Sequence, residues 1–409
     1  MTSVKASTAR NIALFPWLKF TESLMFWQAV WFLYFQQNLS AAEAILLYAT
    51  YEVAVTVLEV PSGYMSDRLG RRRTLIASAL VMLGGLVLLA IGGSFGIFMA
   101  GQALIGAGMA FWSGTDSSLL YESLAAEGRE DEIEAHELRA WRFSYVAAAL
   151  SAVAGGALAL LDPSAPFWAT ALAAVGVLLL VLTCTEPPQH ASREGLETIA
   201  GLRSLKASLL NPVLGWLFAI SLLMYVFSHI PFVFGQPFIL EALNGIGLAA
   251  EAPLISGTVS AIMMGVSVVA SGFATRLRGA IGLRGMVLLA FGMQIGLCAV
   301  LGLSNSALVI AVLFLRMVPD ALSRPFIMAR IQPLLSSDSR ATYLSLRSLC
   351  ARVIFAGSLY IASGSASGVG NMAYGDIRAI LGWYVFAGMV LFAGLFVAAR
   401  RMGQTAQPD

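Results

Sequence analysis

Charged side chains lie inside long apolar segments of this chain, where an unpaired charge is costly. Residues 12–38 hold Lys19 and Glu22, three positions apart, and residues 42–66 hold Glu52. Helical spacing of three places Lys19 and Glu22 on one face, where they can pair. An ionised group at the centre of a membrane costs at least ~2.5–3.5 kcal/mol, so such residues are functional candidates. We expect these three to contact a substrate or to take part in coupling.

A second set of charges lies in the apolar segment 305–330. Arg316, Asp320 and Arg324 are spaced i, i+4 and i+8, which predicts a ladder along one helix face. Desolvation favours the protonated form of a carboxyl group, so a buried acid can exchange a proton near neutral pH. Arginine supplies fork-shaped hydrogen bonds to an anion. Arg316 and Asp320 therefore join the candidates for coupling or substrate contact.

The composition places these charges in a membrane protein. Hydrophobic residues make up 58% of the 409-residue chain and charged residues 12%, against about 25% charged in soluble domains. About 20 apolar residues cross a bilayer as a helix. A soluble helical bundle would need polar stripes, which most of these segments lack. Twelve segments are long enough: 12–38, 42–66, 73–93, 95–120, 139–161, 165–184, 213–240, 252–275, 283–303, 305–330, 341–365 and 379–399.

The placement of basic residues predicts the orientation of the chain. With the N-terminus in the cytoplasm, most lysines and arginines fall in cytoplasmic segments, and only Arg378 falls in an outside loop. Residues 1–11 are polar and the apolar segment after them is too long for a cleavable signal. We expect a multi-pass protein of the inner (plasma) membrane with both termini in the cytoplasm.

The longest polar connection divides the segments six and six. It covers residues 185–212, so we expect bundles at 1–184 and 213–409 joined by this cytoplasmic linker. Residues 62–66 (SGYMS) resemble residues 271–275 (SGFAT), an offset of 209. Such repeats favour two duplicated halves, with the substrate site near mid-membrane at their interface.

The two halves differ in charge at aligned positions. Asp116 aligns with Arg324, and Glu122 aligns with Arg330. Attraction between the halves in one conformation is one explanation. The other is that the positive-inside bias alone placed arginines in the second half.

The turn after the second apolar segment carries a motif, GYMSDRLGRRR, at residues 63–73. Glycine permits a tight turn, aspartate can cap the positive end of a helix, and arginine can bind carboxylates and carbonyls at helix ends. The residues that define the pattern are Gly63, Asp67, Arg68, Gly70, Arg71 and Arg72.

This motif resembles the signature of the major facilitator superfamily, and the resemblance covers essentially the whole chain. It implies twelve transmembrane helices in two pseudo-symmetric six-helix bundles. Residues 112–116 and 121–124 look like a bacterial branch of multidrug and organic-solute permeases. The chain departs from drug/proton antiporters at Gln102, where many carry arginine, and at Ser151-Ala152, where they carry Gly-Pro.

In the family this turn latches the halves on the cytoplasmic side when the carrier is open outward. The alternative is that the arginines at 71–73 only enforce topology. As members of the same gate network we expect Glu59, Asp116, Arg324 and Arg347.

Together these features favour a secondary active transporter that moves a small amphipathic organic solute by alternating access, through proton-coupled export. The alternatives are an uptake carrier for an organic anion and a non-transporting receptor or scaffold. We expect no enzyme, cofactor, metal or nucleic-acid partner, because no metal-ligand cluster, nucleophile elbow or phosphate-binding loop is present in the sequence. The expected partners are the solute, a proton or other coupling ion, and the lipid bilayer, and a monomer suffices.

Overall fold

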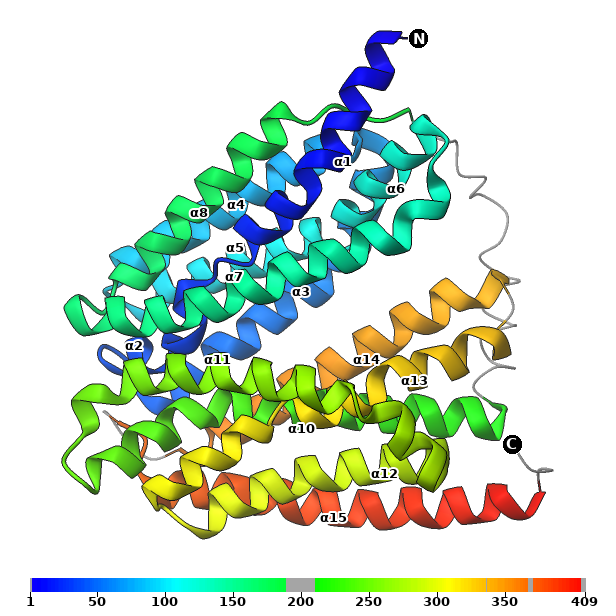
Figure 1. Cartoon of the computed structure of the whole chain (residues 1–409). Helices are drawn as coiled ribbons and strands as arrows, with labels where there is room; N and C mark the ends of the chain where they lie inside the picture. The colour runs from blue at the N-terminus through cyan, green and yellow to red at the C-terminus, as the bar shows by residue number, and fades with distance from the viewer. Residues whose placement is uncertain (1, 189–209, 336, 367–370, 406–409) are drawn as a thin grey trace. The chain divides into compact units, whose positions relative to one another are not determined.

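The computed structural model describes residues 2–188, 210–335, 337–366 and 371–405, and every regular element in these ranges is a helix. The chain forms two compact units (Figure 1). Unit 1 contains residues 1–192, 250–261 and 368–371, and unit 2 contains the rest. Most of the expected linker, residues 189–209 of 185–212, lies outside the described residues.

The elements follow one another along the chain with short connections. Unit 1 contains α1 (Thr2–Glu22), η1 (Phe26–Ala29), α2 (Trp31–Gln36), α3 (Ala41–Leu69), α4 (Arg71–Ile91), α5 (Phe95–Trp112), α6 (Thr115–Glu127), η2 (Glu130–Glu132), α7 (Ile133–Leu161) and α8 (Ala165–Thr183). Unit 2 contains α10 (Pro212–Asn244), α12 (Ala274–Leu303), η4 (Ala307–Leu315), α13 (Val318–Leu334), α14 (Ser337–Ser363) and α15 (Tyr374–Thr405). The remaining elements, η3 (Ala249–Glu251) and α11 (Ala252–Ser271), run across the boundary between the units.

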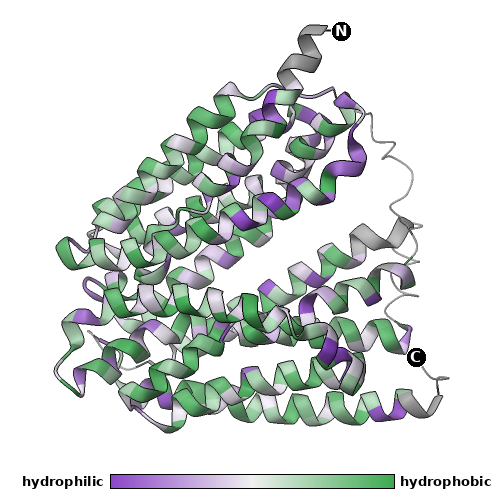
Figure 2. Ribbon diagram, in the orientation of Figure 1, coloured by the Kyte–Doolittle hydropathy of each residue, from purple (hydrophilic) through white to green (hydrophobic). Residues whose placement is uncertain are grey.

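Ten helical spans of the described residues are long and apolar enough to cross a membrane. Apolar residues cover these helices on most sides (Figure 2), as a chain with lipid for solvent requires. The all-helical polytopic architecture predicted from the sequence is therefore confirmed. The two predicted segments without a matching span, 12–38 and 305–330, are each interrupted in the structure.

The first interruption ends α1 at Glu22, and the chain continues as the 3₁₀ helix η1. Gly155 of α7 explains this close approach, because a Cβ at that position would overlap the carbonyl oxygen of Phe26. Ser151 donates a 3.5 Å hydrogen bond to the carbonyl of Ser23, and Ser144 donates one of 3.4 Å to that of Lys19. Serine side chains of α7 thus bind carbonyls at the end of α1, as a broken helix in a membrane requires.

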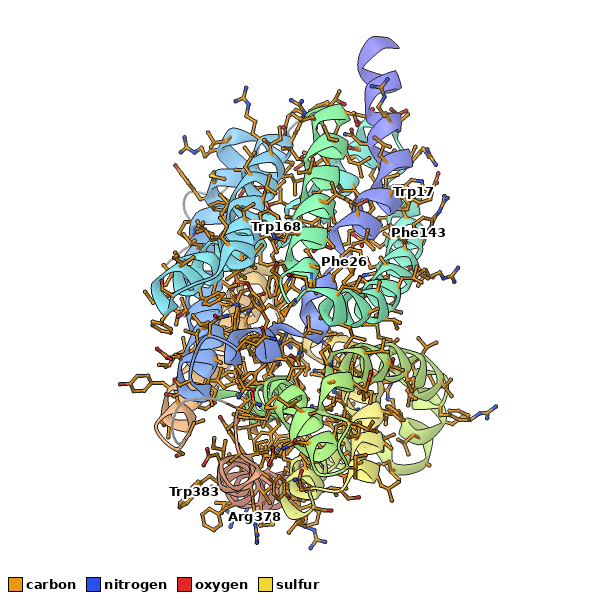
Figure 3. All side chains as sticks on the ribbon, turned by 90° about the vertical axis from the view of Figure 1, so that its left-hand side faces the viewer. Trp17, Phe26, Phe143, Trp168, Arg378 and Trp383 are labelled. Carbon is orange, nitrogen blue, oxygen red and sulfur yellow. The ribbon has the colours of Figure 1, made fainter. Side chains whose placement is uncertain are left out.

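Aromatic packing fixes α1 against α7 before the break. Trp17 and Phe143 meet edge to face with their ring centroids 5.1 Å apart (Figure 3). Such pairs stabilise beyond their buried area. The break in α1 therefore follows from a close contact with α7 at a defined height.

The second interruption separates η4 from α13 and corrects the predicted charge ladder. Arg316 caps the C-terminus of η4, whereas Asp320 and Arg324 belong to α13. Pro319 in the first turn of α13 accounts for the break, because proline disfavours helical backbone in the residue before it and suits the start of a helix. The three side chains do not share one continuous helix.

Local sequence sets the bounds of α3, which leads to the motif turn. Ser40 and Glu43 form a reciprocal capping box, with hydrogen bonds of 3.2 and 2.9 Å, at its N-terminus. Gly70 ends it with φ 101° and ψ 155°, a conformation open essentially to glycine alone. The glycine thereby separates α3 from α4.

Candidate functional site

The motif turn forms a polar cluster within unit 1. The Arg71 guanidinium bonds Asp67 Oδ1 at 2.5 Å from Nη1 and Glu122 Oε1 at 3.0 Å from Nη2. Arg71 Nη1 also donates to Ser66 Oγ at 2.8 Å. One arginine therefore joins the end of α3, the start of α4 and the middle of α6, which the sequence motif alone predicts only in part.

The ends of α4 and α8 hold each other through Arg72 and Glu186. The backbone amides of Arg71 and Arg72 donate to the Glu186 carboxylate at 2.6 and 3.0 Å. In return, the Arg72 guanidinium donates to the carbonyls of Val181 and Leu182, at 3.3 and 2.9 Å. A carboxylate at a helix N-terminus and a cation at a C-terminus both match the helix dipole. This clasp binds two antiparallel helices end to end.

Gly70 leaves room for the Glu186 carboxylate. A Cβ at Gly70 would lie 2.6 Å from Glu186 Cδ. The glycine is thus required both by its backbone conformation and by its neighbour. Burial of the carboxyl group raises the pKa of Glu186 above its ordinary value of 4.5, while the two amide hydrogen bonds act in the opposite direction.

The other two motif residues lie at the surface of the unit. Gly63 has no atom within 4 Å of the position that a Cβ would take. The Arg68 guanidinium lies over the Tyr64 ring, 5.2 Å from its centroid. Neither residue joins the polar cluster through a contact that the described structure gives.

The buried Lys19 pairs with Asp116, which corrects the predicted pairing of Lys19 with Glu22. Lys19 Nζ lies 2.8 Å from Asp116 Oδ2, and only 15% and 6% of the two side chains is exposed. The ammonium also lies 5.9 Å from the centroid of Trp112 and 5.8 Å from that of Trp141. Glu22, the last residue of α1, instead accepts a 3.2 Å hydrogen bond from Ser23. The physical reason is the end of α1 at Glu22, which leaves Asp116 as the direct partner.

Two hydroxyl groups connect this buried pair to the motif cluster. Thr115, the neighbour of Asp116, donates a 3.2 Å hydrogen bond to Ser66 Oγ, which also accepts from Arg71. Gly114 has φ 78° and turns the chain between α5 and α6, so that Thr115 and Asp116 fall in the first turn of α6. Asp116 thus belongs to the Lys19 pair and adjoins the gate cluster through Thr115.

The remaining candidates of unit 1 lie on α3. Glu52 is buried, with 1% of the residue exposed. Glu59 lies two turns later and is half-buried, and its backbone carbonyl accepts a 2.8 Å hydrogen bond from Ser62. The structure does not bring the Glu59 side chain into the Arg71 cluster by a contact given for it.

Arginines of unit 2 lie against aromatic rings and sulfur atoms. Arg316 lies over Phe232, 5.2 Å from the ring centroid, and its Nε is 3.0 Å from Met263 Sδ. Arg352 lies over Tyr225, 5.7 Å from the centroid. These contacts favour flat, polarisable surroundings for the two guanidinium groups.

Asp320, Arg324 and Arg347 complete the predicted set in unit 2. Gln294 donates a weak 3.4 Å hydrogen bond to Asp320 Oδ1. Arg324 is exposed, and Arg347 Nη1 lies 3.3 Å from Met328 Sδ. No contact given for the described residues joins Arg316, Asp320 and Arg324 into a ladder.

Sequence reasoning missed Glu186, Ser66 and Thr115. Glu186 falls at the start of the expected linker, where an acid carries no signal by itself. Its position just after an apolar helix, facing a turn with a glycine before two arginines, is the pattern that could have indicated a cap. The two hydroxyl residues have no charge to single them out.

The sequence and fold were compared with known proteins. A family model described as Major Facilitator Superfamily matches residues 16–359. A comparison with curated proteins finds no match.

Three solved structures illustrate the similarity of fold. A nucleoside transporter, NupG, is 12% identical with a TM-score of 0.75, covering 95% of this chain and 98% of that one. A peptide transporter, POT, solved with sulfate, is 14% identical with a TM-score of 0.71, covering 100% and 99%. A bacterial homologue of the human lysosomal transporter Spinster, solved inward-facing, is 14% identical with a TM-score of 0.65, covering 100% and 99%. The chain belongs to the Major Facilitator Superfamily and is a membrane transporter of that type.

Proposed function

We propose that this transporter exports a small amphipathic organic solute in exchange for protons, by alternating access. It would act as a multi-pass protein of the inner (plasma) membrane with both termini in the cytoplasm, and with residues 185–212 linking two bundles at 1–184 and 213–409. The proposal assigns the chain to the multidrug and organic-solute permeases of the superfamily. A monomer suffices for this mechanism.

The observation that carries the proposal is the ion pair between Lys19 and Asp116, with Glu22 one turn away. Both side chains of the pair are largely buried, with 15% and 6% exposed. Breaking a buried pair by neutralising one partner leaves the other charge uncompensated. A proton that enters this group therefore has a large effect on its energy.

The mechanism follows from that balance. Protonation of Asp116 or Glu22 would weaken the hold on the Lys19 ammonium. The hydroxyl groups of Thr115 and Ser66 lie between Asp116 and Arg71, with hydrogen bonds of 3.2 and 2.8 Å. A change at the pair would thus reach the motif cluster, which we propose to be the cytoplasmic latch. Glu59, Arg324 and Arg347 remain proposed members of the gate network.

The other coupling candidates have supporting features of their own. Glu52 is a carboxylic residue buried in α3, and Asp320 is reached by Gln294 at 3.4 Å. Either can act as a second proton acceptor under the same physical rule, because burial disfavours the charged form.

Uptake of an organic anion is the second candidate function. Arg316 and Arg352 lie over Phe232 and Tyr225, with centroid distances of 5.2 and 5.7 Å. A guanidinium flanked by an aromatic ring suits a planar anion, which can bond the cation and stack on the ring. The nucleoside and peptide transporters of similar fold leave both candidates open for this chain, since their cargo belongs to those proteins.

Flux in proteoliposomes tests the proposal. Solutes from both classes, amphipathic cations and organic anions, are followed in each direction with and without an imposed pH gradient. Gradient-driven exit that is lost in Asp116→Asn and Glu22→Gln, and kept in the control Glu132→Gln, is the expected result. Glu132 suits the control because it forms an exposed pair with Arg129.

Other results would point elsewhere. Solute movement that ignores the gradient would remove proton coupling. Anion entry without exit of the amphipathic solutes would favour the second candidate. Binding of a solute without any flux would indicate a receptor.

A further inference from the structure

Unit 2 contains a second helix start of the kind found at Gly70. Gly282 has φ 70° and ψ 170°, close to the 101° and 155° of Gly70, and it interrupts α12. A new helical segment begins at Leu283, just as α4 begins at Arg71. An arginine occupies the second position of each segment, Arg72 in one and Arg284 in the other.

The helix that packs beside each start is also equivalent. α8 is the last helix of unit 1 and runs along α4, and α15 is the last helix of unit 2 and runs along α12 (Figure 1). In unit 1, the residues after α8 deliver the Glu186 carboxylate to the amides of Arg71 and Arg72. The equivalent start in unit 2 can therefore be compared directly with an occupied one.

In unit 2 a cavity of about 30 Å³ takes the place of that carboxylate. It is lined by Val213, Trp216, Leu217, Leu283, Arg284, Arg330 and Met402. Val213 belongs to the first turn of α10 and Leu283 to the first turn of the new segment of α12. Two helix N-termini and two arginines thus border one cavity.

The charge around the cavity has one sign. α12 contains no acidic residue. The acids of α13 and α15, Asp320 and Asp376, lie in the first turns of those helices, whereas Arg330 and Met402 lie near their other ends. Guanidinium groups and helix N-termini both favour an anion. The cavity has the donors of the Glu186 site without an acid of its own.

We propose that this cavity binds the phosphate group of an anionic membrane lipid. Its size admits oxygen atoms between Arg284 and Arg330, as the Glu186 site admits carboxylate oxygens, and the rest of the headgroup stays outside. The lining by Trp216, Leu217 and Met402 suits the neighbouring glycerol and acyl chain. Basic pockets between transmembrane helices at the cytoplasmic side are suited to anionic headgroups, and this is the side on which we expect these helix ends. The site does not depend on the proposed coupling or cargo.

Lipid titration of the purified full-length protein, followed by native mass spectrometry, tests this site. Phosphatidylglycerol is compared with zwitterionic phosphatidylcholine for the wild type, Arg284→Gln, Arg330→Gln and the double variant. About 1 kcal/mol per arginine near a headgroup converts to about fivefold weaker phosphatidylglycerol binding for each single change. Arg284→Lys keeps the charge and should bind better than Arg284→Gln.

Arg400→Gln is the matched control, because Arg400 lies in the last part of α15 but stacks on Phe396, 4.4 Å from the ring centroid. It should bind phosphatidylglycerol as the wild type does. Equal weakening in Arg400→Gln and Arg284→Gln would overturn the site in favour of diffuse attraction, as would equal binding of both lipids by the wild type. Competition by inorganic phosphate as effective as the lipid would overturn the lipid as ligand and identify a soluble phosphate.

Discussion

Glu186 and Arg72 each bind the end of the helix that carries the other. The Glu186 carboxylate accepts from the first amides of α4, and the Arg72 guanidinium donates to the last carbonyls of α8. Each contact satisfies groups that a helix leaves without an internal partner. The motif arginines therefore act inside unit 1 as well as in any latch.

Replacing Glu186 with alanine should destabilise the start of α4. Loss of a capping side chain costs about 1 kcal/mol, and the first amides of α4 should exchange hydrogen faster. Hydrogen exchange of residues 71–74 in detergent measures this directly. Asp131→Asn, which removes an exposed acid of η2, should leave that exchange unchanged; equal acceleration in both variants would contradict the cap.

The contribution of Glu186 should depend on pH in a defined direction. Its pKa in the folded chain is raised above 4.5 because burial disfavours the charged form. Between that value and the raised one, the folded state binds more protons than the unfolded state, so stability falls as pH rises through this window. The gap in melting temperature between the wild type and Glu186→Gln should shift against the wild type over the same window. A gap that moves in its favour with rising pH would refute this sign.

Two glycines of the motif should differ sharply when changed to alanine. Gly70→Ala places a side chain at φ 101°, which costs ~1–3 kcal/mol, and its Cβ would meet the Glu186 carboxyl group at 2.6 Å. Gly63→Ala meets nothing within 4 Å and should be nearly neutral. Thermal unfolding by tryptophan fluorescence compares the two. Adding Glu186→Ala to Gly70→Ala should restore part of the loss, since it removes the collision but keeps the strained backbone.

The fold could be predicted from the sequence because membrane helices need only length and apolar composition. The breaks could not, because Gly155 lies more than a hundred residues from the end of α1 that it accommodates. Pro319 is visible in the sequence, yet it lies within an apolar segment long enough to suggest one helix. Apolar length alone does not distinguish a continuous helix from two shorter ones.

The candidate site was predicted residue by residue better than pair by pair. Lys19 and Glu22 satisfy the i, i+3 rule, but the partner that contacts Lys19 is Asp116, on a different helix. Burial costs select which residues are charged in a membrane, whereas tertiary packing decides which of them meet. Glu186 shows the converse, since it looks like part of a linker and becomes functional only through the end of α4.

The Lys19–Asp116 pair should contribute far more stability than the exposed pair of Arg129 and Glu132. Removing one partner of a buried pair costs about 3–5 kcal/mol, whereas exposed pairs are worth about 0–1 kcal/mol. Asp116→Asn should therefore lower the melting temperature strongly and Glu132→Gln only slightly. Lys19→Met combined with Asp116→Leu should recover much of the loss, because no charge then remains unpaired. A double variant as unstable as Asp116→Asn would show that packing, rather than charge, holds this region.

Gly155→Ala should disturb the break in α1 more than its size suggests. The added Cβ would overlap the carbonyl oxygen of Phe26, so η1 must move away from α7 or the helix must shift. Overpacking of this kind costs about 1–3 kcal/mol. The shift would also lengthen the contact from Ser151 to the Ser23 carbonyl, already 3.5 Å, and hydrogen exchange at residues 23–30 should rise with it. Gly296→Ala, in α12 with no atom within 4 Å of the new Cβ, is the control and should leave both melting temperature and exchange unchanged. If Gly155→Ala matched that control, the close approach of η1 to α7 would not be what ends α1 at Glu22.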